Sequence, residues 1–347
     1  MDARERLEAF WAGERPDRIP YTCYQYEWKD VKDDPAWEPL FAAGLRVTFA
    51  VNTVVPRERN IEPAKESYDR DGHHYDRYVI RTPVGEVSRL IEDGWPREYW
   101  IKSAEDYRVM RHVVENTELV PNYDEWAPTE HKVEGYGLVH AAINSPSPIQ
   151  IILVHYVGLE NFAYHLADYE DEMMALYEAL RRNFRRRIEI AAEGPGRYVS
   201  VLENFSAETM GPRRYAQFHV PVYEECFPIL HQAGKIVGTH YDGKLASCAD
   251  LVAGTPIDLI ESLTPPPEGD MTLAECRAAW PKKLFWSNIN VSTYQLPPAK
   301  LQKTVLDAVA AAAPDGRRLA FEVSEHLPRN WKDSLSVVLD ALEETRE

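Results

Sequence analysis

The second half of the chain alternates short apolar runs with segments whose apolar residues recur at helical spacing. Strands that are apolar along their whole length are typical of a parallel sheet covered by helices on its faces. The pattern predicts strands at 137–143, 150–154, 198–202, 235–239, 256–260, 284–287 and 319–323, and helices at 170–192, 221–233, 272–280, 298–312 and 330–344. About seven or eight such units in a chain of 347 residues favour a distorted (β/α)8 TIM barrel over an open sheet.

The first part of the chain follows other patterns. Residues 1–12 predict an amphipathic helix that places Leu7, Phe10 and Trp11 on one side. Residues 45–130 are irregular, β-rich and crowded with charged and aromatic residues, and Pro83 and Gly85 mark a hairpin turn. We expect a single barrel domain over residues 1–347, with regular β/α units at 137–347. The 45–130 segment is then an excursion that covers the site, with Tyr75, Tyr78 and Trp95 as an aromatic cover that contacts substrate.

Composition and charge narrow the classes of function. Hydrophobic residues make up 44% of the chain and charged residues 27%, as in a globular protein in water. The net charge of −17 argues against partners such as nucleic acid or an anionic membrane surface. Apolar runs too short to span a bilayer and a charged N-terminus without a signal peptide predict a cytoplasmic protein. The four cysteines form no C-x-x-C pair and are expected to be buried free thiols, and the dinucleotide and P-loop fingerprints are absent.

Polar and ionisable residues close one predicted strand after another. In a TIM barrel the chemistry lies at the C-terminal ends of the strands, so these residues are candidates for the site. A single Glu or Asn after a strand is most often a helix cap, and that interpretation stays open for each one. The candidates for substrate binding are Glu203, Asn204, Glu261 and Asn288, together with the three aromatic cover residues.

His240 and Asp242 form the sharpest candidate pair. Alternate residues in extended chain point to the same side, so an imidazole and a carboxylate face one cavity. Such a pair is half of a site for Zn²⁺ or another divalent metal, and Glu325 after the last strand is the natural third ligand. Without a metal, the same three residues would act as acid–base groups. His240, Asp242 and Glu325 are therefore the predicted catalytic residues under both interpretations.

Several motifs, in their order along the chain, resemble the uroporphyrinogen decarboxylase superfamily. They are Gly-Thr-His-Tyr-Asp-Gly at 238–243, the Pro-Ile-Asp-Leu-Ile-Glu-Ser-Leu-Thr-Pro-Pro-Pro run at 256–267 and Gly-Asp-Met-Thr-Leu-Ala-Glu at 269–275, with further likeness at 82–86, 203–214 and 324–328. The resemblance spans roughly residues 80 to 340. It implies a distorted TIM barrel and a small-molecule substrate.

The superfamily has two well-known branches. The decarboxylase branch carries an early Arg-Gln-Ala-Gly-Arg clamp for substrate carboxylates, whereas residues 18–24 of this chain are largely aromatic and apolar. The corrinoid-linked methyltransferases bind zinc through H-x-C and a later Cys. Here His240 matches the His, Asp242 stands at the first Cys, and Glu325 falls near the second.

The resemblance thus implies a methyltransferase that moves a methyl group between a small methylated substrate or acceptor and a corrinoid protein, with a metal or an acid activating the substrate. The alternatives are a metal-free carboxy-lyase acting on a small acidic substrate, and a non-catalytic module that docks a corrinoid domain.

Overall fold

The computed structural model describes residues 1–323 and 326–346. These residues form two compact units. The barrel unit comprises Met1–Thr53, Tyr123–Asn144 and the chain from Ala191 onward, and the second unit comprises Val54–Asn122 and Ser145–Ile190.

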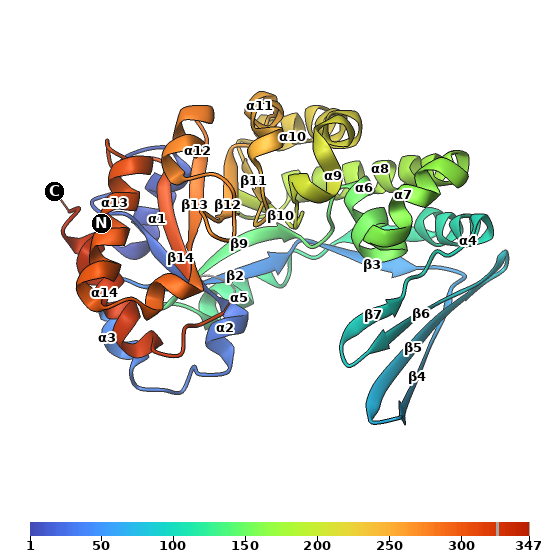
Figure 1. The fold of residues 1–347 in the computed structure, drawn as a ribbon, viewed down its shortest axis with the longest axis horizontal. Helices are drawn as coiled ribbons and strands as arrows, with labels where there is room; N and C mark the ends of the chain where they lie inside the picture. The colour runs from blue at the N-terminus through green and yellow to red at the C-terminus, as the bar shows by residue number, and fades with distance from the viewer. Residues whose placement is uncertain (324–325, 347) are drawn as a thin grey trace. The chain divides into compact units, whose positions relative to one another are not determined.

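Among the described residues of the barrel unit, eight parallel strands close into a barrel (Figure 1). This confirms the predicted TIM barrel. The order around the barrel is β1 (Tyr21–Tyr24), β14 (Leu319–Val323), β13 (Leu284–Ile289), β12 (Leu259–Leu263), β11 (Ile236–His240), β10 (Tyr198–Val201), β9 (Gly137–Ile143) and β2 (Arg46–Asn52). Strand β2 pairs back with β1 and completes the closure. It occupies the first residues of the 45–130 segment.

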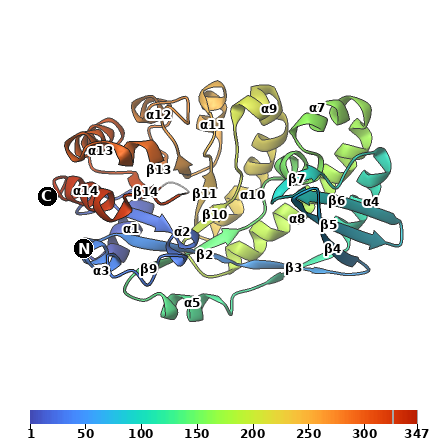
Figure 2. The ribbon, with the colours of Figure 1, turned by 60° about the horizontal axis from the view of Figure 1, so that its bottom comes forward.

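Helices cover the outside of this barrel, and α10 to α14 run along strands β10 to β14 (Figures 1 and 2). The later helices begin where the sequence supplies helix-starting residues: Thr272 and Glu275 form a capping box at α12, and Pro298 opens α13. The helices of this unit are α1 (Ala3–Trp11), α2 (Gln25–Lys29), α3 (Trp37–Ala42), α5 (Trp126–Lys132), α9 (Ala207–Arg214), α10 (Val220–Gln232), α11 (Ala249–Gly254), α12 (Leu273–Ala279), α13 (Pro298–Ala312) and α14 (Trp331–Glu343).

The strand predicted at 150–154 is wrong. These residues lie in α6 (Pro148–Ile151) and in the π-helical turns Ile152–Val157 that continue it. Pro148 starts the helix, and Ile149, Ile152 and Leu153 are all buried. A short, fully buried apolar run has no periodicity that separates strand from helix, which is why the sequence misled here.

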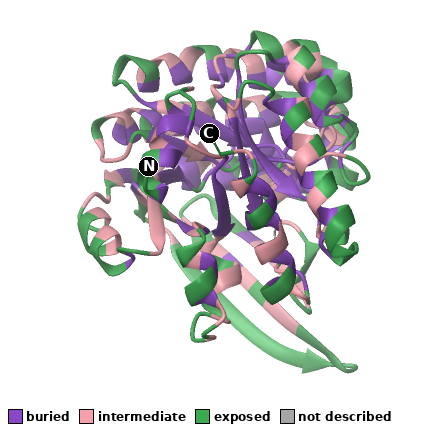
Figure 3. Ribbon diagram, turned by 90° about the vertical axis from the view of Figure 1, so that its left-hand side faces the viewer, coloured by how far each residue is buried: buried purple, intermediate pink, exposed green. Residues whose placement is uncertain are grey.

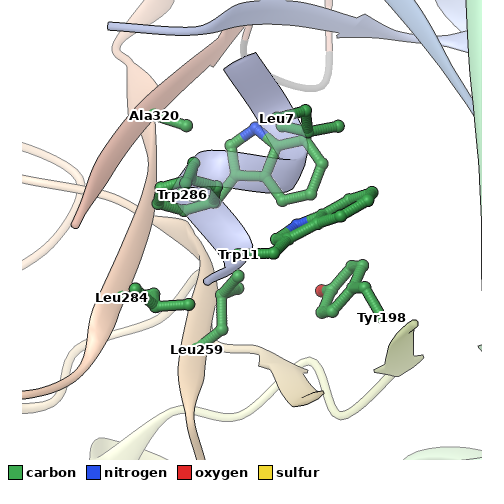
Figure 4. Close-up of a cluster of buried hydrophobic side chains, with 8 residues drawn as sticks. Leu7, Trp11, Tyr198, Leu259, Leu284, Trp286 and Ala320 are labelled. Atoms are coloured by element: carbon green, nitrogen blue, oxygen red, sulfur yellow. The ribbon is translucent and has the colours of Figure 1, made fainter. Parts of the chain in front are cut away.

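Helix α1 packs against the beginnings of the barrel strands, as its apolar face predicts. Leu7, Phe10 and Trp11 are buried, and the Trp11 ring stacks on Tyr198 at a centroid distance of 5.3 Å (Figure 4). The rest of this cluster is Leu259, Leu284, Trp286 and Ala320. Because α1 covers the N-terminal ends of the strands, the C-terminal ends are left for a site.

The second unit joins an exposed antiparallel sheet to helices. Its described strands are β3 (Val54–Glu58) paired with β8 (Thr117–Pro121), and a sheet of β4 (Glu62–Arg70), β5 (His73–Thr82), β6 (Gly85–Glu92) and β7 (Trp95–Glu98). The Thr82–Gly85 pairing confirms the predicted hairpin. The remaining helices are α4 (Ala104–Glu115), α7 (Leu159–Asp168) and α8 (Glu170–Glu193). Figure 3 contrasts the buried barrel strands with largely exposed strands such as β4.

The fold also bears on the cysteines and on membrane-spanning segments. Cys23, Cys226, Cys248 and Cys276 are buried free thiols, as predicted. In the part of the chain that the structure describes, no helix is long and apolar enough to cross a membrane.

Candidate active site

Neighbouring strands β11 and β12 bring His240 and Glu261 together. The two residues are register partners in a parallel pair, so their side chains point to the same side of the sheet. The His240 Nδ1 atom lies 2.5 Å from Glu261 Oε2, and each side chain is only 9% exposed. Two residues that the sequence placed at separate strand ends therefore form one buried carboxylate–imidazole pair.

Tyr24, the last residue of β1, completes the hydrogen bonding of this carboxylate. Its hydroxyl donates to Glu261 Oε1 at 2.5 Å. Strands β14 and β13 separate β1 from β12 around the barrel, so the phenol reaches Glu261 through the barrel interior. Burial by itself would raise the pKa of Glu261, but the charge and hydrogen bond of His240 and the hydrogen bond from Tyr24 outweigh it and lower that pKa. Glu261 is therefore ionised at neutral pH.

Glu322 on β14 is a second buried acid with the opposite electrostatics. It is 1% exposed and accepts a hydrogen bond from the Ser262 backbone N–H at 3.2 Å. Burial, followed by the negative charge of Glu261, raises the pKa of Glu322 well above its usual range. The site thus holds one ionised and one protonated carboxyl group, a division that often separates acid and base roles.

A bulge in β12 connects the two acids. Ser262 has φ of +58°, and the register with β13 shifts between Glu261 and Leu263. A non-glycine residue in this conformation carries strain on the order of 1 kcal/mol and is held by its surroundings. Asn288 supplies part of that support, because its Nδ2 donates to Ser262 Oγ at 2.7 Å and to Thr264 Oγ1 at 3.1 Å. Asn288 therefore binds the bulge, and its predicted contact with substrate stays a prediction.

A cavity of about 410 Å³ opens beside the Glu261–His240 pair. Its size suits a small molecule. His140 on β9 also lines the cavity, and burial lowers its pKa to about 4, which leaves the imidazole neutral at pH 7. His140 Nδ1 is buried and has no hydrogen-bond partner among the described residues. The lining residues are Tyr24, Gln25, Tyr26, Thr48, Ala50, His140, Ala142, Asn144, Ser200, Leu202, Asn204, His240 and Glu261.

The two predicted residues at the end of β10 have separate surroundings. Asn204 lines the cavity and has φ of +48°. Glu203 is fully buried and accepts a hydrogen bond from the Tyr223 hydroxyl at 2.9 Å. Tyr241 donates in turn to the Tyr223 oxygen at 3.1 Å. The neighbours of Glu203 thus include a buried tyrosine network, while Asn204 faces the space where a ligand would bind.

The predicted metal ligands are only partly described. His240 Nε2 lies 3.8 Å from Asp242 Oδ2, and the Asp242 side chain is 34% exposed. Glu325 lies outside the described residues. Among those that are described, no three His, Cys, Asp or Glu side chains lie close enough together to hold a metal ion. The described side chains alone therefore do not make up a metal centre.

The predicted aromatic cover belongs to the second unit. Tyr75 stacks on Tyr68 at 5.2 Å, and the Tyr78 ring lies under the guanidinium of Arg89 at 4.7 Å. The Trp95 side chain is 78% exposed. Their role as a cover over the substrate stays a prediction.

Comparisons with known proteins bear on the fold of the chain. No family model matches the chain, and no curated protein matches it by sequence. Among solved structures, a methyltransferase from Methanosarcina mazei matches with a TM-score of 0.58 and 10% identity, covering 99% of each chain. The chain therefore has the fold of this methyltransferase. A Yersinia pestis DHPS structure covers 94% of each chain at 8% identity, but its TM-score of 0.30 is too low to indicate a shared fold.

Sequence reasoning missed three members of this site. His140 and Glu322 lie inside strands β9 and β14, whereas the predicted site residues were those that follow strands. A histidine or glutamate inside an apolar strand of a two-sided sheet is a usable signal, because burying such a group is costly unless it is partnered. Tyr24 carried no comparable signal, since its role depends on β1 closing the barrel opposite β12.

Proposed function

We propose that this protein is a methyltransferase of the uroporphyrinogen decarboxylase superfamily. It would move a methyl group between a small methylated substrate or acceptor and a corrinoid protein. One observation carries the proposal: the ionised Glu261, bound by Tyr24 and His240, lies at the edge of a small-molecule cavity. The fold shared with a methyltransferase and the His240–Asp242 motif support it.

The chemistry of methyl transfer explains why such a pair is useful. The methyl group moves as a formal cation, so the donor atom keeps the pair of electrons of the broken bond and the acceptor supplies the pair for the new one. A donor atom that is positively charged, or that gains a proton as the bond breaks, is the better leaving group. The Glu261 carboxylate stabilises positive charge at this place, and its hydrogen bond holds a proton on His240 Nδ1.

A metal-assisted form of the proposal depends on Glu325. A zinc ion would need this residue in addition to His240 and Asp242, and it would make a bound acceptor or leaving group more reactive. Element analysis of the purified protein tests this part alone. About one zinc per chain, lost in His240→Ala, would support a metal centre. Protein that stays metal-free after zinc is supplied would remove the metal from the proposal.

The lyase alternative receives no support from the cavity. A decarboxylase for a small acidic substrate needs a cation that binds the carboxylate. None of the residues that line the cavity is Lys or Arg in the described chain. We therefore keep methyl transfer as the proposed function.

The test uses the intact chain and free cobalamin in place of the partner's corrinoid. Purified protein is mixed with cobalamin reduced to the Co(I) state and with a panel of methyl ethers, methylthiols and methylated amines, and the absorbance spectrum reports conversion to methylcobalamin. We expect conversion with one donor class, and a loss of at least about a hundredfold in Glu261→Gln, the order expected for removing one transition-state contact.

Glu134→Gln, the same change at a side chain that is 81% exposed, is the matched control and should retain the rate. The proposal would be overturned if the folded protein transferred no methyl group from any donor class, either to free cobalamin or to a purified corrinoid protein.

A further inference from the structure

The cavity beside Glu261 is electrostatically one-sided. Its lining contains a carboxylate, and among the described residues that line it there is no lysine or arginine to balance that charge. His140 adds no positive charge, because burial keeps its imidazole neutral. The hydroxyl and amide groups of Thr48 and Asn144 add polar but uncharged surface.

His240 does not reverse this balance. It lies between two carboxylates, with Nδ1 at 2.5 Å from Glu261 and Nε2 at 3.8 Å from Asp242. Asp242 lies beside the ring but outside the cavity lining; counting it, two carboxylates against at most one imidazolium leave a net negative charge in every protonation state of the ring. An anionic ligand placed here would meet uncompensated like charge, whereas a cation would complete the set.

Aromatic rings supply the second requirement of a cation site. Tyr24 and Tyr26 both line the cavity, and their rings stack at a centroid distance of 5.1 Å with an interplanar angle of 13°. Tyrosine faces attract alkylated ammonium ions, which are large and weakly hydrated cations. A carboxylate next to tyrosine rings is therefore a suitable lining for such an ion.

We infer that the cavity binds a methylated ammonium ion and that this cation is the methyl donor. The inference rests on the proposed methyl transfer and names its substrate class. The donor's N–CH3 bond breaks with both electrons remaining on nitrogen, so the amine leaves neutral. The methyl group passes as a formal cation to the reduced corrinoid of the partner protein, which supplies both electrons of the new bond.

Binding of three probes of the same shape tests the inference without any methyl transfer. Choline carries the positive charge, 3,3-dimethylbutan-1-ol is its neutral carbon analogue, and 3,3-dimethylbutanoate is negative. Titration calorimetry on the full chain should show choline binding at least about tenfold more tightly than the neutral alcohol, with the acid weakest. Three results would overturn the inference: equal binding of choline and the alcohol, tighter binding of the acid, or no detectable binding of choline at concentrations up to about 10 mM.

Two substitutions place the choline site in this cavity. Asn144→Lys adds an ammonium group to the lining at an exposed position just after β9, and should weaken choline binding at least about tenfold while improving binding of the acid. Gln232→Lys, at the exposed end of α10 and outside the lining, is the matched control and should leave all three affinities unchanged. If Asn144→Lys binds choline like the unaltered protein, the cavity is not the cation site.

The outcome also separates this inference from the proposed function. Choline binding in the cavity without methylation of cobalamin from any donor would leave the cation site standing and count against the methyltransferase. Methyl transfer from a neutral ether, with no preference for choline over the alcohol, would support the methyltransferase function and count against the cation site.

Discussion

The same substitution at the two buried glutamates should change stability in opposite directions. Glu322 is protonated at neutral pH, and glutamine has the same shape and an oxygen that can still accept the hydrogen bond from Ser262 N–H. In the unfolded chain a glutamate ionises above about pH 4.3, so folding must return a proton to Glu322. Glu322→Gln removes that cost, and we expect the variant to be at least as stable as the unaltered protein.

The pH dependence fixes the sign of this effect. Burial and the charge of Glu261 raise the pKa of folded Glu322, so its contribution to stability is present below the unfolded pKa and is lost as pH rises. For each pH unit between the unfolded and the folded pKa, the unaltered protein loses about 1.4 kcal/mol of unfolding free energy. The advantage of Glu322→Gln should therefore be absent near pH 4 and grow as pH rises from there toward the folded pKa of Glu322.

Glu261→Gln should destabilise the barrel. The substitution removes the charge that accepts the hydrogen bonds from His240 and Tyr24, both at 2.5 Å. Breaking a buried pair on one side typically costs about 3 kcal/mol or more, because the remaining partner stays buried without its counter-charge. The expected result is a loss of about 3 kcal/mol at pH 7.

Urea unfolding at pH 5 and pH 8 measures both effects. Near-ultraviolet circular dichroism reports on packed aromatic side chains, among them Trp11 and Trp286 in the barrel. Glu134→Gln serves again as the exposed control. If Glu322→Gln loses as much stability at pH 8 as Glu261→Gln, Glu322 is ionised in the folded protein and the assignment of one charged and one neutral acid is refuted.

Three further predictions follow from single buried groups. Trp11→Ala should cost about 3 kcal/mol in unfolding free energy, whereas Trp11→Phe should cost less than about 1 kcal/mol because the buried indole N–H has no hydrogen-bond partner in the described part of the chain. Urea unfolding compares the two variants, and equal losses would contradict the packing of Trp11. His140 has a pKa of about 4 in the fold and 6.5 unfolded, so stability should fall by up to about 3 kcal/mol between pH 6.5 and pH 4; His140→Gln should flatten this dependence in unfolding measured across that range, and an unchanged slope would show that His140 is not its source. Burial raises the pKa of the Cys276 thiol to about 12 and also raises that of Cys23, so a thiol reagent such as Ellman's should label none of the four cysteines until the protein is unfolded, and rapid native labelling would contradict the buried positions.

Hydrophobic patterning predicted most of the barrel because the later strands consist mainly of apolar residues. The segments 137–143 and 319–323 were located to the residue as β9 and β14, and α13 was likewise predicted in full. The early strands β1 and β2 were not assigned. β1 is only four residues long and mixes tyrosine, threonine and cysteine, so its identity as a strand depends on its neighbours β14 and β2.

The site was predicted to the extent that its residues end strands. His240 and Asn204 follow that rule, and both line the cavity. Glu261 was found although its strand was placed three residues too early, at 256–260 rather than Leu259–Leu263. No sequence rule could pair Glu261 with Tyr24 or Glu322. Those contacts arise from the closure of the barrel and from an irregularity in one strand.

That irregularity gives Glu322 a backbone hydrogen bond, while burial and the charge of Glu261 keep the pKa of Glu322 raised. In a regular strand, Glu261 and Ser262 would point to opposite faces, and the Ser262 N–H would take part in the ladder. At the bulge, where Ser262 has a positive φ, this N–H instead donates to Glu322, while Glu261 keeps its register with His240. Glycine at position 262 would adopt this φ without strain, but it has no hydroxyl to accept the hydrogen bond from Asn288. Serine is therefore the better residue here, because its hydroxyl keeps the bulge attached to β13 through Asn288.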